Sequence, residues 1–154
     1  MPRKSCSASA QGTLPGVSAI RSERAGSTGD ETAWSAKIDY PNDLVDAAIT
    51  YQRIGDGFDP PLGFVPRRGV QLLNLNADVS PRPGWHGVRQ LFFENRFNLA
   101  TDLKGRWETY RLFIAPVNVL LESGDRLEFN VAPQGERLVE PFEVSDGVLI
   151  DPGT

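Results

Sequence analysis

The sequence is poor in the residues that most often carry chemistry, with one cysteine, one histidine and one methionine among 154 residues. The single cysteine, Cys6, can form neither a disulfide framework nor a thiol pair within the chain, and we interpret it as an unpaired thiol. The single histidine, His86, excludes a His-rich metal site and leaves no Ser/His/Asp or Cys/His arrangement. We therefore predict no catalytic residue, no metal site and no cofactor, and we do not expect an enzyme.

Two further absences bound the class of protein. No uninterrupted apolar run approaches the ~20 residues that a transmembrane helix needs, and the basic start, residues 1–4, is not followed by the apolar segment of a signal peptide. We therefore expect either a piece of a longer exported protein or a protein that is not exported. Basic residues are also outnumbered, because residues 31–154 carry 12 basic and 18 acidic side chains, which argues against nucleic acid as a partner.

What the sequence does contain is apolar–polar alternation with a period of two, repeated from Ala33 to Ala132. This period is typical of half-buried strands, because the side chains of a strand alternate between its faces. Several of the runs reach the ~9–11 residues of a membrane-crossing strand, whereas strands of globular proteins have about 5–6 residues. The strands we expect are residues 34–40, 44–53, 69–79, 86–100, 106–121 and 126–131.

The connections between these strands differ in length. Those after Tyr40, Val79 and Leu121 are short, whereas those after Arg53 and Ala132 are long and the one after Ala100 is intermediate. Alternating short turns and long loops are typical of outer-membrane β-barrels. Aromatic residues gather near the strand ends, where membrane interfaces favour them: Tyr40 and Trp85 on the short-turn side, Tyr51 and Trp107 on the long-loop side.

We therefore predict an all-β fold, an antiparallel up-and-down meander of long strands that forms part of an outer-membrane-type β-barrel. Residues 1–30 are expected to be irregular or disordered, and residues 31–154 to form about six strands followed by a long C-terminal loop, with a short strand near residues 144–150. Pro116 should mark a bulge or kink in its strand. The predicted lumen-lining residues are Asn74, Asn76, Glu94, Arg96, Glu108, Glu128 and Asn130. The predicted lipid-facing residues are Leu73, Leu75, Leu91, Phe93, Phe97, Phe113, Val117, Leu127 and Phe129.

Three groups of charged residues have alternative interpretations. Glu94, Glu108 and Glu128 could supply the general acid and base of a glycosidase, but they repeat with the strand pattern, which favours a lumen lining paired with arginines. The pair at residues 67–68 could meet lipopolysaccharide phosphates or be ordinary loop charge. Residues 55–60 (GDGFDP) superficially resemble a calcium loop but lack the repeated Asp spacing and the terminal Glu, so we predict no calcium site.

Four short motifs carry a resemblance to a known family: GFVPRRG at residues 63–69, SPRP at 80–83, SGDRL at 123–127 and EPFEV at 140–144. With these, residues 32–154 resemble an interior piece of the C-terminal β-barrel of a family of uncharacterised bacterial outer-membrane proteins. Members of that family carry an N-terminal domain similar to carbohydrate-binding module family 9. We expect the sequence as given to depart from this pattern by lacking a signal peptide, that N-terminal domain and the later strands.

The resemblance implies a location in the bacterial outer membrane as part of a longer exported protein. It implies the lipid bilayer, lipopolysaccharide and the rest of the barrel as partners, and a structural or transport-related role linked to glycan binding or uptake. It supplies no catalytic residues. The alternative is a soluble antiparallel β-sandwich that binds a ligand, because a sandwich buries one face of each sheet with the same alternation.

Overall fold

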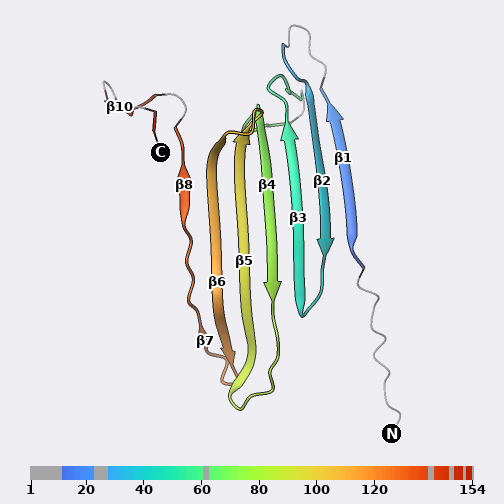
Figure 1. The fold of residues 1–154 in the computed structure, drawn as a ribbon, viewed down its shortest axis with the longest axis vertical. Helices are drawn as coiled ribbons and strands as arrows, with labels where there is room; N and C mark the ends of the chain where they lie inside the picture. The colour runs from blue at the N-terminus through green and yellow to red at the C-terminus, as the bar shows by residue number, and fades with distance from the viewer. Residues whose placement is uncertain are drawn as a thin grey trace.

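The protein is described by a computed structural model, which covers residues 12–22, 28–60, 63–138, 141–145, 148–150 and 152–153. All regular structure in these residues is β-strand, arranged as one eight-stranded antiparallel sheet and a separate two-stranded hairpin (Figure 1). The predicted all-β antiparallel meander is confirmed, and the sheet is open rather than closed into a barrel. Over the same residues, no helix is long and apolar enough to cross a membrane.

Six long strands form the body of the sheet, and each pairs with its neighbour in the sequence. They are β1 (Leu14–Arg21), β2 (Thr32–Tyr40), β3 (Val45–Ile54), β4 (Val70–Val79), β5 (Val88–Asp102) and β6 (Trp107–Leu121). The connections 41–44, 80–87 and 122–125 lie at one end of the sheet, here the short-turn end. The connection 103–106 and the described residues of the connections 22–31 and 55–69 lie at the other end, here the long-loop end, although 103–106 is itself a short turn.

The outermost strand beside β6 is broken into pieces. β7 (Arg126–Leu127) and β8 (Gln134–Glu136) both pair with β6, and between them Val131 forms an isolated bridge with Ile114. Pro133 has no N–H to donate to this ladder, but its carbonyl accepts a hydrogen bond from the Leu112 N–H at 2.9 Å. The chain therefore follows β6 along most of its length without forming a continuous strand. The remaining strands, β9 (Phe142–Ser145) and β10 (Val148–Ile150), form the hairpin.

Two predictions of irregular structure are wrong. Leu14–Arg21 forms β1, although the segment 1–30 was predicted to be irregular, and residues 1–11 and 23–27 of that segment lie outside the described residues. The stretch after Pro133 was predicted as a long loop but contains β8 and the β9–β10 hairpin, in which β10 corresponds to the short strand predicted near residues 144–150. All eight residues of β1 are exposed, so the backbone hydrogen bonds to β2 hold it in place rather than buried side chains. Alternation reports side-chain burial, and it carries little information about an edge strand that buries none.

The register of the ladder assigns the side chains to two faces, because directly opposed residues of an antiparallel pair share a face. One row of opposed residues is apolar and crosses six strands: Val17, Ala36, Tyr51, Leu73, Leu99 and Tyr110. The adjacent row, shifted by one residue, consists of Gly16, Lys37, Thr50, Asn74, Asn98, Arg111 and Gln134. We call the two sides of the sheet the apolar face and the polar face.

A bulge at Pro116 changes the faces along β6. Glu94 lies opposite Ala115 but Phe92 lies opposite Asn118, so β6 carries one extra residue at this point, and the bulge predicted at Pro116 is confirmed. One correction follows from it. Phe113, predicted on the side of Phe97, lies opposite Arg96 on the polar face, and Leu112 takes the position opposite Phe97.

The long-loop end carries a compact cap, which we define as residues 28–31 and 55–59. The Gly55 N–H donates to the Thr32 carbonyl at 2.8 Å and the Gly57 N–H donates to the Asp30 carbonyl at 3.1 Å. Phe58, at 6% exposure, is one of only four buried hydrophobic side chains in the described residues. The cap is therefore a small packed cluster at one end of a sheet that, in the described residues, is a single layer.

Replacing Gly55 by alanine is expected to destabilise the protein by about 2–3 kcal/mol. The new Cβ would overlap the backbone carbonyl oxygen of Asp30, and no side-chain rotation relieves a clash with backbone. The matched control is Gly16→Ala in β1, where nothing lies within 4 Å of the new Cβ and a change within about 0.5 kcal/mol is expected. Urea unfolding of each chain in detergent micelles, followed by tryptophan fluorescence, measures both changes, and equal midpoints would contradict the role of Gly55.

Candidate functional site: the two faces of the sheet

The apolar face is continuous and uncovered. The described residues place no second layer over it, so large side chains in the middle of its strands remain exposed, among them Ile38 at 52% and Ile49 at 42%. The predicted lipid-facing residues Leu73, Leu75, Leu91, Phe93, Phe97 and Leu127 share this face by register. Val117 lies in the bulge itself, and Phe129 follows β7 in the irregular stretch, 63% exposed.

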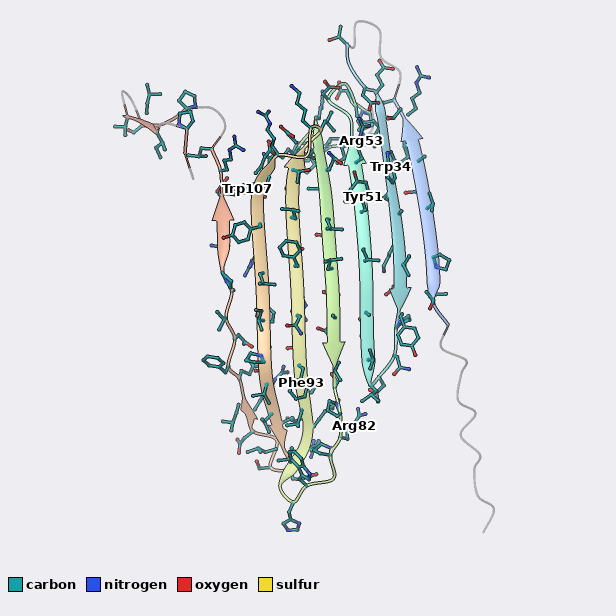
Figure 2. The ribbon with its side chains drawn as sticks, in the orientation of Figure 1. Trp34, Tyr51, Arg53, Arg82, Phe93 and Trp107 are labelled. Atoms are coloured by element: carbon teal, nitrogen blue, oxygen red, sulfur yellow. The ribbon has the colours of Figure 1, made fainter. Side chains whose placement is uncertain are left out.

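Aromatic side chains mark both ends of the apolar face. At the long-loop end, the rings of Trp34 and Tyr51 lie 5.0 Å apart and those of Trp107 and Tyr110 lie 5.8 Å apart (Figure 2). Tyr40, the last residue of β2, and Phe93 lie toward the short-turn end. Trp85 lies in the connection 80–87 at that end too, so the predicted placement of the aromatic residues is confirmed.

The polar face collects most of the residues predicted to line a lumen. Asn76 lies opposite Arg96, and Asp78 lies opposite Glu94. Glu108 differs, because it lies where the register shifts near the start of β6 and its carboxylate pairs with Arg67 of the 55–69 connection, 2.6 Å apart.

Asn118 organises the polar face beside the bulge. At 1% exposure it is the most buried polar side chain in the described residues. Its amide nitrogen donates to Glu94 at 3.4 Å and to Asn130 at 3.1 Å, and its amide oxygen accepts from the Phe129 N–H at 2.9 Å. The amide nitrogen and the amide oxygen of Asn118 thus both have hydrogen-bond partners, and these bonds join β5 and β6 to the irregular outer strand.

Arginines cover the two phenylalanines of the polar face. The Arg96 guanidinium lies 5.3 Å from the ring centre of Phe113, and the Arg126 guanidinium lies 5.0 Å from that of Phe92. Cation–π contacts of this kind let an aromatic ring occupy a polar surface. Both arginines also have a carboxylate neighbour on their own strand or its extension: Glu94 for Arg96 at 3.5 Å and Glu128 for Arg126 at 2.5 Å.

The acidic residues weighed as catalytic acids each have a separate partner. Glu94 contacts Asn118 and Arg96, Glu108 pairs with Arg67, and Glu128 pairs with Arg126. They therefore do not form the facing pair of carboxylates that glycoside hydrolysis uses. Within the described part of the chain, no group of three or more His, Cys, Asp or Glu side chains is placed to hold a metal ion. His86 is exposed in the connection 80–87, and Cys6 lies outside the described residues.

Loop residues at the long-loop end are also engaged with one another. Arg68 pairs with Asp59, whose N–H donates to the Ser22 hydroxyl at 2.9 Å. In the GDGFDP segment, one carboxylate oxygen of Asp56 accepts from the Asp30 N–H at 2.7 Å and the Gly57 N–H at 3.0 Å. The aspartates of this segment thus order the loop backbone.

The carboxylate of Asp30 forms most of the polar contacts that hold the cap to β2 and β3. This carboxylate accepts hydrogen bonds from the Thr32 hydroxyl at 2.6 Å and the Thr32 N–H at 3.0 Å, and it pairs with Arg53. The hydrogen bond from the Thr32 side chain, followed by that from Arg53, lowers the pKa of Asp30 from 3.8 to about 2. The ionised form therefore holds the start of β2 against the end of β3.

Two residues of the polar face were not predicted to lie there. Arg111 lies opposite Asn98, and Gln134 lies opposite Arg111. Arg111 was missed because an unbroken alternation through β6 assigns it to the apolar side, and Gln134 because it follows a proline in a stretch without pattern. The signal that could have found Arg111 is Pro116, which reverses the faces on either side of the bulge.

Acid is expected to loosen the cap. Because the pKa of Asp30 is depressed, its contribution to stability is fully present above about pH 4 and is lost as the pH falls through about 2. Asp30→Asn should open the cap at neutral pH and remove that step from the acid titration. Fluorescence of Trp34, which contacts Tyr51 next to Arg53, reports the change. As a control, Asp125→Asn, in a turn at the short-turn end, should keep the wild-type profile, and an acid step retained in Asp30→Asn would contradict the assignment.

Comparison of the chain with protein-family models, with curated proteins and with solved structures found no match. The resemblance to a family of outer-membrane proteins therefore stays a prediction.

Proposed function

We propose that this chain forms a section of the wall of an outer-membrane-type β-barrel, with the apolar face toward lipid and the polar face toward a water-filled lumen. Its role would be structural or transport-related. The observation that carries the proposal is the apolar face itself: it continues across seven strands, nothing in the described residues covers it, and aromatic rings lie at both of its ends.

The dimensions of the strands fit a bilayer. β2, β3 and β4 have 9, 10 and 10 residues, and β5 and β6 have 15 each. A tilted membrane-crossing strand needs about 9–11 residues. Trp and Tyr rings are favoured where the hydrocarbon meets the headgroups, which is the position that the Trp34–Tyr51 and Trp107–Tyr110 pairs would take.

The polar face supports an orientation with only one side toward lipid. It carries Lys37, Arg96 and Arg111 together with Asp46 and Glu94. A lysine or arginine facing lipid at the bilayer midplane costs about 2–4 kcal/mol. The charged side chains are therefore stable only where they face water. A water-filled lumen on the polar side of the sheet provides this while the apolar face contacts lipid.

The edges of the sheet favour a longer barrel, of which this chain would be a part. In hydrocarbon, each backbone polar group without a partner costs several kcal/mol. β1 forms one edge of the sheet, and the broken strand of β7 and β8 forms the other. Further strands at these edges would satisfy their backbone groups and close the wall, as the family resemblance implies.

The remaining partners follow from the same proposal. A barrel wall of this kind belongs in the bacterial outer membrane, in contact with the bilayer and lipopolysaccharide, and the resemblance adds glycans. Arg67 and Arg68, considered as phosphate ligands, pair with Glu108 and Asp59, so lipopolysaccharide would have to compete with these carboxylates.

A matched pair of substitutions tests which face meets lipid. Ile49 lies on the apolar face in the middle of β3, and its neighbour Thr50 lies on the polar face. Ile49→Arg should weaken folding into lipid vesicles by about 2–4 kcal/mol, whereas Thr50→Arg should be tolerated because its charge would face water. Folding of the full chain into vesicles is followed by tryptophan fluorescence and by the heat-dependent mobility of the folded form on gels.

The wild-type chain is expected to aggregate without detergent and to fold in its presence. A soluble monomer that melts cooperatively without detergent would contradict the membrane assignment and favour the soluble β-sandwich, in which a second layer covers the apolar face. Equal effects of Ile49→Arg and Thr50→Arg would also contradict it.

A further inference from the structure

One line of hydrogen-bonding side chains crosses the polar face from strand to strand. Asn74 on β4 lies opposite Asn98 on β5, Asn98 lies opposite Arg111 on β6, and Arg111 lies opposite Gln134 on β8. We call these four residues the amide–arginine row. Neighbouring strands lie about 4.8 Å apart, so the row presents four polar groups at regular intervals along one line.

A hollow lies over this row. Its volume is about 510 Å³, and all four residues of the row line it. Small-molecule sites in proteins typically have volumes of about 300–1,000 Å³. Thr109 and Glu136, which lie opposite each other one position further along the strands, also line the hollow and extend it toward the long-loop end.

The side chains of the row have no partner within the described part of the chain. None of the four forms a hydrogen bond or ion pair there. Arg111 stands out among the arginines, because every other described arginine except Arg137 has a carboxylate within 4.0 Å. The nearby Arg96 and Arg126 are both occupied by a carboxylate and a phenylalanine ring.

The donors and acceptors of the row define what would match it. A guanidinium offers only donors and fits a carboxylate in a two-pronged geometry. The amides of Asn74, Asn98 and Gln134 each offer donors and a carbonyl acceptor, and that acceptor needs a donor from the ligand, which a carboxylate group does not have. Hydroxyl groups donate and accept, so they match the amides on both sides of the arginine.

We infer that the amide–arginine row binds small hydroxylated carboxylates of the sugar-acid type, with the carboxylate on Arg111 and the hydroxyls on the flanking amides. The inference deepens the proposed function and rests on it for its setting, since in a barrel wall the row would meet solutes in the lumen. Glu136 at the rim accepts from hydroxyls but repels the carboxylate, which directs the charged end of the ligand toward Arg111.

Three probes separate the two parts of this recognition. Gluconate carries both a carboxylate and hydroxyls, sorbitol has the same carbon chain with an alcohol in place of the carboxylate, and acetate has the carboxylate alone. Each is titrated into the full ¹⁵N-labelled chain folded in detergent micelles, and the side-chain amide signals of Asn and Gln are followed by NMR. Gluconate should shift the signals of Asn74, Asn98 and Gln134 saturably, with a dissociation constant on the order of 1 mM. Sorbitol and acetate should bind at least about tenfold more weakly.

Variants assign the binding to the row. Arg111→Gln should weaken gluconate binding about 10- to 100-fold, because it removes hydrogen bonds to a charged group. Asn98→Ala should weaken it several-fold. The matched control is Arg126→Gln, on the same face but already paired with Glu128, which should leave gluconate binding unchanged.

Three outcomes would overturn the inference: no saturable shift with gluconate, equal binding of sorbitol, or equal losses in Arg111→Gln and Arg126→Gln. The result is independent of the lipid test. If the chain proves to be a soluble monomer, the same titration runs without detergent, and if Ile49→Arg blocks insertion while gluconate fails to bind, the barrel wall stands and the solute site does not.

Discussion

The antiparallel hydrogen-bond ladder that joins each strand from β1 to β6 to its neighbour is the constraint on which the rest of the structure depends. Only four hydrophobic side chains are buried in the described residues, and Phe58 and Val70 lie in or beside the cap. The sheet therefore has no core that would correct a misplaced strand. Each face is defined by register alone, and a slip of one residue would exchange the two faces of a strand.

The two faces satisfy their side chains in different ways. Beside the bulge the polar face does so internally, because Asn118 joins three chain segments and arginines lie between carboxylates and aromatic rings, whereas the amide–arginine row on the same face is left without partners in the described residues. Each exposed ion pair contributes little to stability, typically below about 1 kcal/mol, so their main effect is on the positions of the side chains. Within the described residues, no other part of the chain covers the apolar face. At about 25 cal/mol per Å² of apolar surface removed from water, covering this face is strongly favourable, and in the proposed function lipid is the cover.

The central strands were predictable because they follow a simple rule. β4 and β5 pair without a register shift, so the faces of Leu75, Phe97 and Asn74 follow directly from the period of two. β6 shows where the rule stops. Pro116 predicts a bulge, but only the pairing with β5 shows that β6 carries the extra residue. Because of this extra residue, Phe113 lies on the polar face and Arg111 lies opposite Asn98. The alternation within one strand cannot predict such a change of face, because a bulge is defined by how two strands pair.

By itself the sequence determined the strand period, the approximate strand bounds, the order of the turns and the positions of the aromatic residues. All of these arise from backbone geometry and from residues close together in the chain. Tertiary structure alone decided the edge strand β1, the cap in which Asp30 meets Asp56 and Arg53, and the amide–arginine row. These features join segments far apart in the sequence. Their register is chosen by the sum of many weak pairings across the whole sheet, which no local pattern contains.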